Sequence, residues 1–77
     1  MKIKIYGKPN CSFCERAKML CRIRGLAYEY TDITTDALVM QEFQVRTSHA
    51  KTVPQIFVDE ILVGGFEQFN AFLSKKA

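Results

Sequence analysis

The chain has 77 residues, of which 48% are hydrophobic and 25% are charged, and this balance suits one folded domain spanning 1–77 and excludes a disordered chain. Eleven Lys and Arg residues against eight Asp and Glu give a net charge of +3, too mild and too scattered for a nucleic-acid-binding surface. The apolar runs, such as Ile61–Val63, are far shorter than a membrane-spanning helix, which needs about 20 apolar residues. The N-terminus also lacks the apolar stretch of a signal peptide. We therefore expect a cytoplasmic protein that binds neither membranes nor nucleic acids.

The hydrophobic pattern changes its period early in the chain. Residues Lys2–Tyr6 alternate polar and apolar, which predicts a strand, and Gly7–Asn10 is a turn cluster. From Cys11 the apolar residues recur every three or four positions, which predicts a helix that ends at Gly25. We expect its buried face to contain Phe13, Ala17, Leu20 and Cys21, widened by Met19 and Ile23.

Five further elements follow. In chain order they are a strand at Ala27–Asp32, a helix at about 35–46, a hairpin of strands at Val53–Val58 and Ile61–Val63, and a helix from Phe66 to Lys76. The resulting order, β-α-β-α-β-β-α, predicts an α/β fold. A helix joins the first two strands, so they should be parallel, whereas the tight turn makes the last two antiparallel. We expect a four-stranded mixed sheet with helices on both faces.

The cysteines are the first candidate functional residues. Three of them, Cys11, Cys14 and Cys21, exclude a complete disulfide framework because the number is odd. Cys11 and Cys14 lie where the first helix begins, and the free N–H groups and partial positive charge there should lower the pKa of Cys11, helped by Lys8. A three-residue spacing brings the two sulfurs within reach of each other. The pattern predicts thiol–disulfide exchange, in which Cys11 attacks a substrate disulfide and Cys14 resolves the mixed disulfide.

Two other interpretations of the cysteines need to be weighed. A zinc site needs two further ligands, and the candidates are Cys21, on the core face of the helix, and His49, in a distant loop. Inert buried cysteines would explain Cys21 but not Cys11 and Cys14, because we expect the start of the helix to be exposed. We therefore predict that Cys21 is a core residue and His49 a surface loop residue.

Two other segments have two possible interpretations each. Pro54 opens a strand after a polar loop, where a cis bond would turn backbone groups toward an extended substrate, but the commoner trans form fits as well. Gly64-Gly65 precede the last helix, where free N–H groups can meet a carboxylate, but a simple turn also fits.

Three segments together resemble the glutaredoxin family, of thioredoxin-like fold. These segments, Lys8–Cys14, Thr52–Phe57 and Gly64–Phe66, stand in the family's order and spacing, and the resemblance covers nearly the whole chain. It implies a glutathione-dependent thiol–disulfide oxidoreductase that reduces protein disulfides and glutathione mixed disulfides, with Cys11 as nucleophile and Cys14 as resolving thiol. Glutathione is then the reductant, no metal is expected, and the partners of the monomer are disulfide-containing proteins, with ribonucleotide reductase as an example.

The resemblance also implies how glutathione binds. Lys8 matches the cation that meets the glycyl carboxylate, and Phe13 takes the place of the tyrosine that flanks the tripeptide. Val53-Pro54 matches a cis-proline element whose backbone pairs with the cysteine of glutathione, and Phe66–Gln68 match the segment that receives the γ-glutamyl end. The implied glutathione-binding residues are Lys8, Phe13, Thr52, Val53, Pro54, Gly65, Phe66, Glu67 and Gln68.

Three residues depart from the family's common pattern. Ser12 replaces a proline, and in some relatives this change accompanies an iron–sulfur cluster held between two subunits and glutathione. An alternative function is therefore a 2Fe-2S scaffold that uses Cys11. Phe13 lacks the tyrosine hydroxyl. Gln68 stands where many members carry an aspartate that meets the γ-glutamyl amine, which should weaken glutathione binding by about 1 kcal/mol.

Overall fold

The N-terminal strand lies inside the sheet, between two other strands. In the computed structural model, which describes residues 1–76, β1 (Ile3–Gly7) lies between β2 (Tyr28–Asp32) and β3 (Gln55–Val58), and β4 (Ile61–Gly64) follows β3. β1 runs parallel to β2 and antiparallel to β3, and β3 runs antiparallel to β4. The predicted four-stranded mixed sheet and the order β-α-β-α-β-β-α are confirmed.

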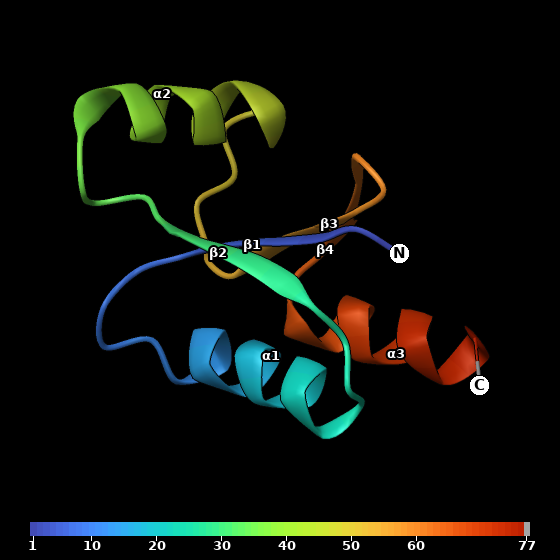
Figure 1. Cartoon of the computed structure of the whole chain (residues 1–77). Coiled ribbons are helices and arrows are strands. Elements are labelled where there is room, and N and C mark those ends of the chain that lie inside the picture. The colour runs from blue at the N-terminus through green and yellow to red at the C-terminus, as the bar shows by residue number, and fades with distance from the viewer. Residues whose placement is uncertain (77) are drawn as a thin grey trace.

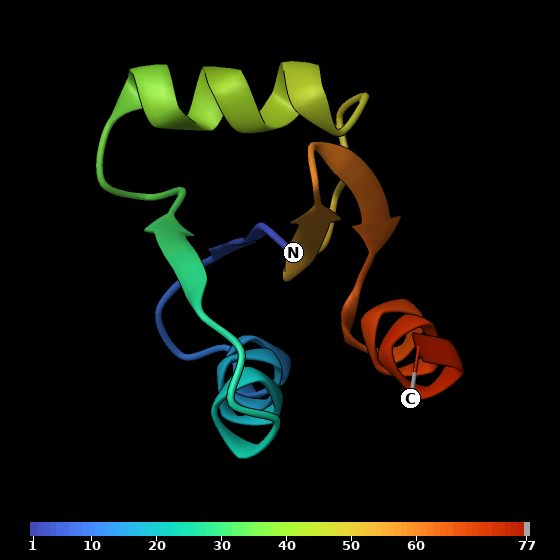
Figure 2. The ribbon, with the colours of Figure 1, turned by 45° about the vertical axis from the view of Figure 1, so that its right-hand side comes forward.

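Three helices cover the two faces of this sheet. α1 (Ser12–Ile23) and α3 (Phe66–Lys76) lie on one face, and α2 (Ala37–Arg46) lies on the other (Figures 1 and 2). No helix within residues 1–76 has both the length and the apolar character that crossing a membrane requires.

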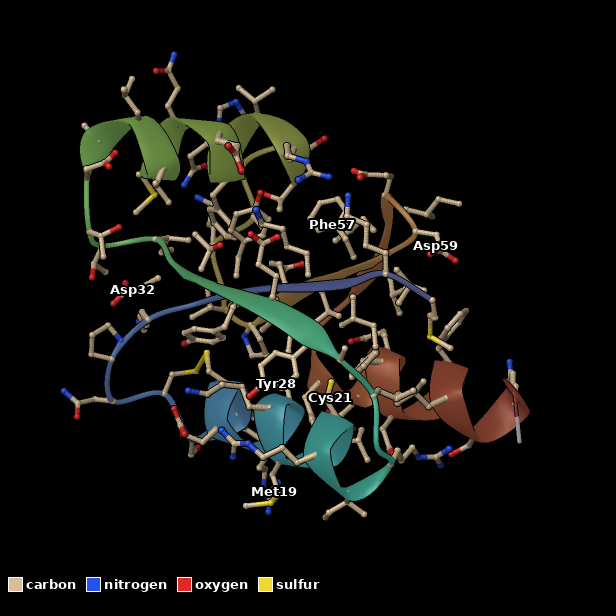
Figure 3. All side chains as sticks on the ribbon, viewed as in Figure 1. Met19, Cys21, Tyr28, Asp32, Phe57 and Asp59 are labelled. Carbon is tan, nitrogen blue, oxygen red and sulfur yellow. A yellow bond between two sulfur atoms is a disulfide. The ribbon has the colours of Figure 1, made fainter. Side chains whose placement is uncertain are left out.

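Each face of the sheet has its own apolar layer because successive residues of a strand point to opposite sides. The layer under α1 and α3 consists of Ile3, Ile5, Ala17, Cys21, Ile56, Val58, Phe69 and Leu73. The layer under α2 consists of Tyr6, Ile33, Phe43 and Phe57. Figure 3 shows Cys21 and Phe57 on opposite sides of the sheet, in these two layers.

α2 begins two residues later than the sequence pattern predicts. Asp36 is its N-cap, with Oδ1 accepting a hydrogen bond of 2.9 Å from the Val39 N–H. The hydroxyls of Thr34 and Thr35, which also suit a cap, instead donate to Asp32 Oδ1 and to the Asp32 carbonyl oxygen. These bonds shape the turn after β2 and leave Asp36 to start the helix.

The buried face of α1 is narrower than predicted. Met19 and Ile23 do not widen it, since they are 49% and 74% exposed, and Figure 3 shows Met19 pointing away from the sheet. Phe13, which we expected in the core, is 46% exposed, whereas Cys14 is fully buried. The fully buried residues of α1 are Cys14, Ala17 and Cys21. The apolar residues Phe13, Met19 and Ile23 lie beside this buried face and remain in contact with solvent.

Candidate active site

Cys11 occupies the N-cap position of α1. After β1 the chain turns through Asn10, at φ 58°, and reaches an extended Cys11 with φ −119° and ψ 105°. The Sγ atom of Cys11 accepts a hydrogen bond of 3.1 Å from the Cys14 N–H, as the side chain of an N-cap serine would. The sulfur therefore sits at the positive end of the helix, where a thiolate is stabilised by a backbone donor and by the helix dipole.

Cys11 and Cys14 form a disulfide, with their Cα atoms 5.2 Å apart. Their surroundings differ, because Cys11 is half-buried at the surface and Cys14 is fully buried beneath it. The expectation that both cysteines are exposed is therefore wrong for Cys14. An incoming disulfide can meet Cys11 only, and Cys14 can react only with a group already attached to Cys11.

The segment before β3 contacts Cys11 through the backbone of Val53. Cys11 Sγ lies 3.8 Å from the Val53 carbonyl oxygen, and Pro54 is buried. The Val53–Pro54 peptide bond is cis, as the resemblance implied and against the commoner trans form. The backbone of Val53 is thus the nearest polar neighbour of Cys11 outside α1 among the hydrogen-bonding contacts described for residues 1–76.

Eight of the nine residues implied for glutathione binding line one hollow of about 180 Å³. They are Phe13, Thr52, Val53, Pro54, Gly65, Phe66, Glu67 and Gln68. The ninth, Lys8, lies at a neighbouring cavity of about 360 Å³, which also contains Thr52 and Val53 in its lining. The two hollows share Thr52 and Val53 in their linings, and together they include the whole implied set.

Two aromatic rings and one arginine form part of the hollow's rim. The Phe13 and Phe66 ring centroids are 6.1 Å apart, and they join the first turns of α1 and α3. Arg16 Cζ lies 5.2 Å from the Phe13 centroid and 6.0 Å from that of Phe66. The sequence alone did not identify Arg16 as a candidate site residue. Its position one helical turn after Phe13 is the signal that places it beside the site.

The start of α3 is capped by the side chain of Gln68. The Gly65 N–H donates a hydrogen bond of 3.0 Å to Gln68 Oε1, so Gln68 reaches back to the residue before the helix as in a capping box. A Cβ on Gly65 would lie 3.3 Å from this oxygen and 3.6 Å from the Pro54 carbonyl oxygen. A Cβ here would therefore crowd only the Gln68 oxygen, since its distance to Pro54 is an ordinary contact.

The residues needed for a zinc site are kept apart by the sheet. Cys21 is buried under α1 and α3, whereas His49 is exposed after α2, where its Nδ1 lies 3.2 Å from Gln44 Oε1. Across the described part of the chain, no three His, Cys, Asp or Glu side chains gather as a metal site. The predictions of a core Cys21 and an exposed His49 are confirmed.

Replacing Cys21 with alanine should lower the free energy of unfolding by about 1 kcal/mol and leave exchange at Cys11 intact. The fully buried sulfur fills space between α1, α3 and the sheet, and its loss leaves a small void. Burial raises the pKa of the Cys21 thiol, which keeps it protonated and unreactive. Urea denaturation and a disulfide-reduction assay measure the two effects, and a large loss of turnover in a folded variant would contradict them.

Comparison with known proteins relates this arrangement to one family. The Glutaredoxin family model matches residues 3–63. A glutaredoxin of Haemophilus influenzae is 33% identical over 82 residues, which cover 99% of this chain and 94% of the relative. The structure of reduced Escherichia coli glutaredoxin superposes with a TM-score of 0.80 at 32% identity, covering 97% of this chain and 95% of that one. A buckwheat glutaredoxin–glutathione complex shares the fold, with a TM-score of 0.80 at 20% identity over 96% and 69% of the chains.

Proposed function

The chain belongs to the glutaredoxin family, and on this premise we propose that it reduces protein disulfides and glutathione mixed disulfides, with Cys11 as nucleophile and Cys14 as resolving thiol. As a member of the family it is a glutathione-dependent thiol–disulfide oxidoreductase. Membership favours this activity over the iron–sulfur scaffold that Ser12 suggested. The observation that carries the assignment of roles is the half-buried Cys11 at the start of α1, bonded to a fully buried Cys14.

The proposed reaction proceeds in two exchanges. The Cys11 thiolate attacks one sulfur of the substrate disulfide, a new S–S bond forms, and the other substrate sulfur leaves as a thiolate. Cys14 then attacks Cys11 Sγ, which releases the second substrate thiolate and forms the Cys11–Cys14 disulfide. Two molecules of glutathione restore the dithiol, the first by attacking Cys11 and the second by removing the bound glutathione as glutathione disulfide. A glutathione mixed disulfide requires Cys11 alone, because glutathione can replace Cys14 as the second attacking thiol.

We propose that glutathione lies across the Thr52–Val53 segment in an extended form. Its cysteine would pair with the Val53 backbone, beside Cys11 Sγ, and its γ-glutamyl end would lie at the start of α3. Its glycyl carboxylate would point to Lys8 at the second cavity. The support for this orientation is that the two hollows share Thr52 and Val53, with Lys8 lining one of them and the first turn of α3 lining the other.

We also propose that residues 1–77 are one glutaredoxin domain that acts as a monomer in the cytoplasm. Disulfide-containing proteins, ribonucleotide reductase among them, are the proposed substrates. These proposals rest on the family resemblance and on the odd number of cysteines, which suits a reducing compartment where cysteines serve redox chemistry or packing.

Trapping the glutathione adduct tests the proposed function directly. The Cys14→Ser variant, treated with glutathione disulfide, should carry one glutathione on Cys11, because the resolving thiol is gone. Peptide mass spectrometry locates the adduct. The absence of an adduct, or an adduct on Cys21 instead, would show that Cys11 is not the residue that meets glutathione.

Replacing Gln68 with aspartate should lower the KM for a glutathione mixed disulfide about fivefold, the equivalent of about 1 kcal/mol. The added carboxylate would face the γ-glutamyl ammonium and also suits the first turn of α3. Asn70→Asp is a matched control, since it adds the same charge to an exposed position of α3 that does not line the hollow. Steady-state kinetics measures both variants, and equal changes in KM would refute a specific contact at Gln68.

A further inference from the structure

Gly7, at the end of β1, leaves room for two side chains below the active disulfide. A Cβ on this residue would lie 2.9 Å from Cys14 Sγ and 2.8 Å from Tyr30 Cζ, and it would overlap the Tyr30 hydroxyl oxygen. The sulfur of Cys14 and the phenol of Tyr30 therefore converge on the space that a side chain would otherwise fill. Tyr30 comes from β2, where it pairs with Ile5 of β1, two residues before Gly7.

The Tyr30 hydroxyl carries a proton that it can donate. The contacts described for Tyr30 are the approach of Lys18 to its ring and the close approach of its hydroxyl to Gly7, and the ring is half-buried. Burial raises the pKa of Tyr30, so the phenol keeps its proton at neutral pH. Lys18 Nζ lies 4.2 Å from the ring centroid and forms an ion pair of 2.9 Å with Glu15.

A thiolate at Cys14 has few other partners. Cys14 is fully buried, and an unpaired buried charge is costly. Its own N–H already donates to Cys11 Sγ. The ionisable groups that act on the neighbouring phenol are Lys18 and Glu15 from α1 and Asp32 from β2, and of these only Lys18 favours a negative charge there.

We propose that Tyr30 donates a hydrogen bond to Cys14 Sγ whenever that sulfur becomes a thiolate. The proposal deepens the function proposed above. In the resolving step the Cys14 thiol loses its proton to water, the thiolate attacks Cys11 Sγ, and the bond between Cys11 and the substrate sulfur breaks. The electron pair leaves with the substrate thiolate, which takes a proton from water. Tyr30 keeps its proton throughout and stabilises Cys14 as the attacking group, and again as the leaving group when glutathione opens the Cys11–Cys14 bond.

The matched control lies on the same strand. Tyr28 is two residues from Tyr30 and is also half-buried against the layer under α1 and α3. It pairs with Ile3, whereas Tyr30 pairs with Ile5, nearer to Gly7. Tyr28→Phe and Tyr30→Phe thus remove the same hydroxyl from neighbouring positions, and each keeps the ring that packs in the core.

The experiment titrates Cys14 alone. In a Cys11→Ser, Cys21→Ala background, thiolate absorbance against pH reports the ionisation of Cys14. Tyr30→Phe should move its midpoint about one unit higher, so that about tenfold less thiolate is present at neutral pH. Tyr28→Phe should leave the midpoint in place. An unmoved midpoint in Tyr30→Phe, or an equal shift in Tyr28→Phe, would overturn the proposal.

A second measurement follows the resolving step in the otherwise unchanged protein. Acid quenching and mass spectrometry give the lifetime of the mixed disulfide between Cys11 and a disulfide-bonded peptide, and Tyr30→Phe should lengthen it about tenfold. A lifetime equal to that of the unchanged protein would also overturn the proposal. The titration needs no glutathione or substrate, so a protein that lacked the proposed activity would still show whether Tyr30 acts on Cys14.

Discussion

Replacing Cys11 with serine should lower the reduction of protein disulfides and of glutathione mixed disulfides by about a thousandfold or more. A hydroxyl is not ionised at neutral pH, and only a thiolate attacks disulfides at a useful rate. Cys14 cannot take over as nucleophile because it is fully buried, and the same is true of Cys21. Turnover coupled to glutathione oxidation measures the loss for both classes of substrate.

The fold should survive this substitution. Serine is among the best N-cap residues, and its oxygen can accept the Cys14 N–H that Cys11 Sγ now accepts. The Cys21→Ala variant is the matched control, because it removes a thiol from the same helix without touching the site. Turnover retained after loss of Cys11, in a protein with unchanged circular dichroism, would place the nucleophile elsewhere.

The period of the apolar residues and the turn residues were sufficient to predict the strands and helices, but not which strands lie next to each other in the sheet. The alternation of Lys2–Tyr6 predicts β1 because Ile3 and Ile5 pack in the layer under α1 and α3, whereas Lys4 lies on the other face and pairs with Glu42. The parallel pairing of β1 with β2 follows from the helix between them. The pairing of β1 with β3 joins residues about fifty positions apart in the chain, and no local pattern encodes it.

The wrong expectations for burial in α1 have one physical cause. The period of apolar residues identifies a helix, but it does not say which of them the sheet covers. Phe13 lies against Phe66 and Arg16 at the rim of a hollow, and Cys14 takes the buried place beside Gly7. Both positions depend on contacts with other elements, so they follow from the tertiary structure alone.

The resemblance to known proteins supplied what the periodicity did not. Apart from Lys8, the residues implied for glutathione come from the first turn of α1, the segment before β3 and the region around the start of α3, and each segment alone has an ordinary structural explanation. These residues lie around one hollow because α1 and α3 share one face of the sheet (Figure 1). The rings of Phe13 and Phe66 lie against each other at the first turns of these helices. Arg16 and Tyr30 were not identified in this way, since their places in the site depend on neighbours from other parts of the fold.

Replacing Cys14 with serine should separate the two activities. Reduction of a protein disulfide should fall about a hundredfold, because the mixed disulfide on Cys11 then has no internal thiol to resolve it and must wait for glutathione. Turnover of a glutathione mixed disulfide should fall much less, by about threefold at most, since glutathione itself supplies the second thiol. Both rates are measured with the same glutathione-coupled assay.

The control for this variant is Cys14→Ala, which removes the thiol without leaving a hydroxyl beside Tyr30. If resolution is the only role of Cys14, the serine and alanine variants should show the same separation between the two substrates. Equal losses on both substrates would mean that Cys14 chiefly supports the reactivity of Cys11, through the N–H that Cys11 Sγ accepts and the packing below it. The ratio of the two rates, which does not change with the amount of folded protein, therefore distinguishes a resolving thiol from a supporting one.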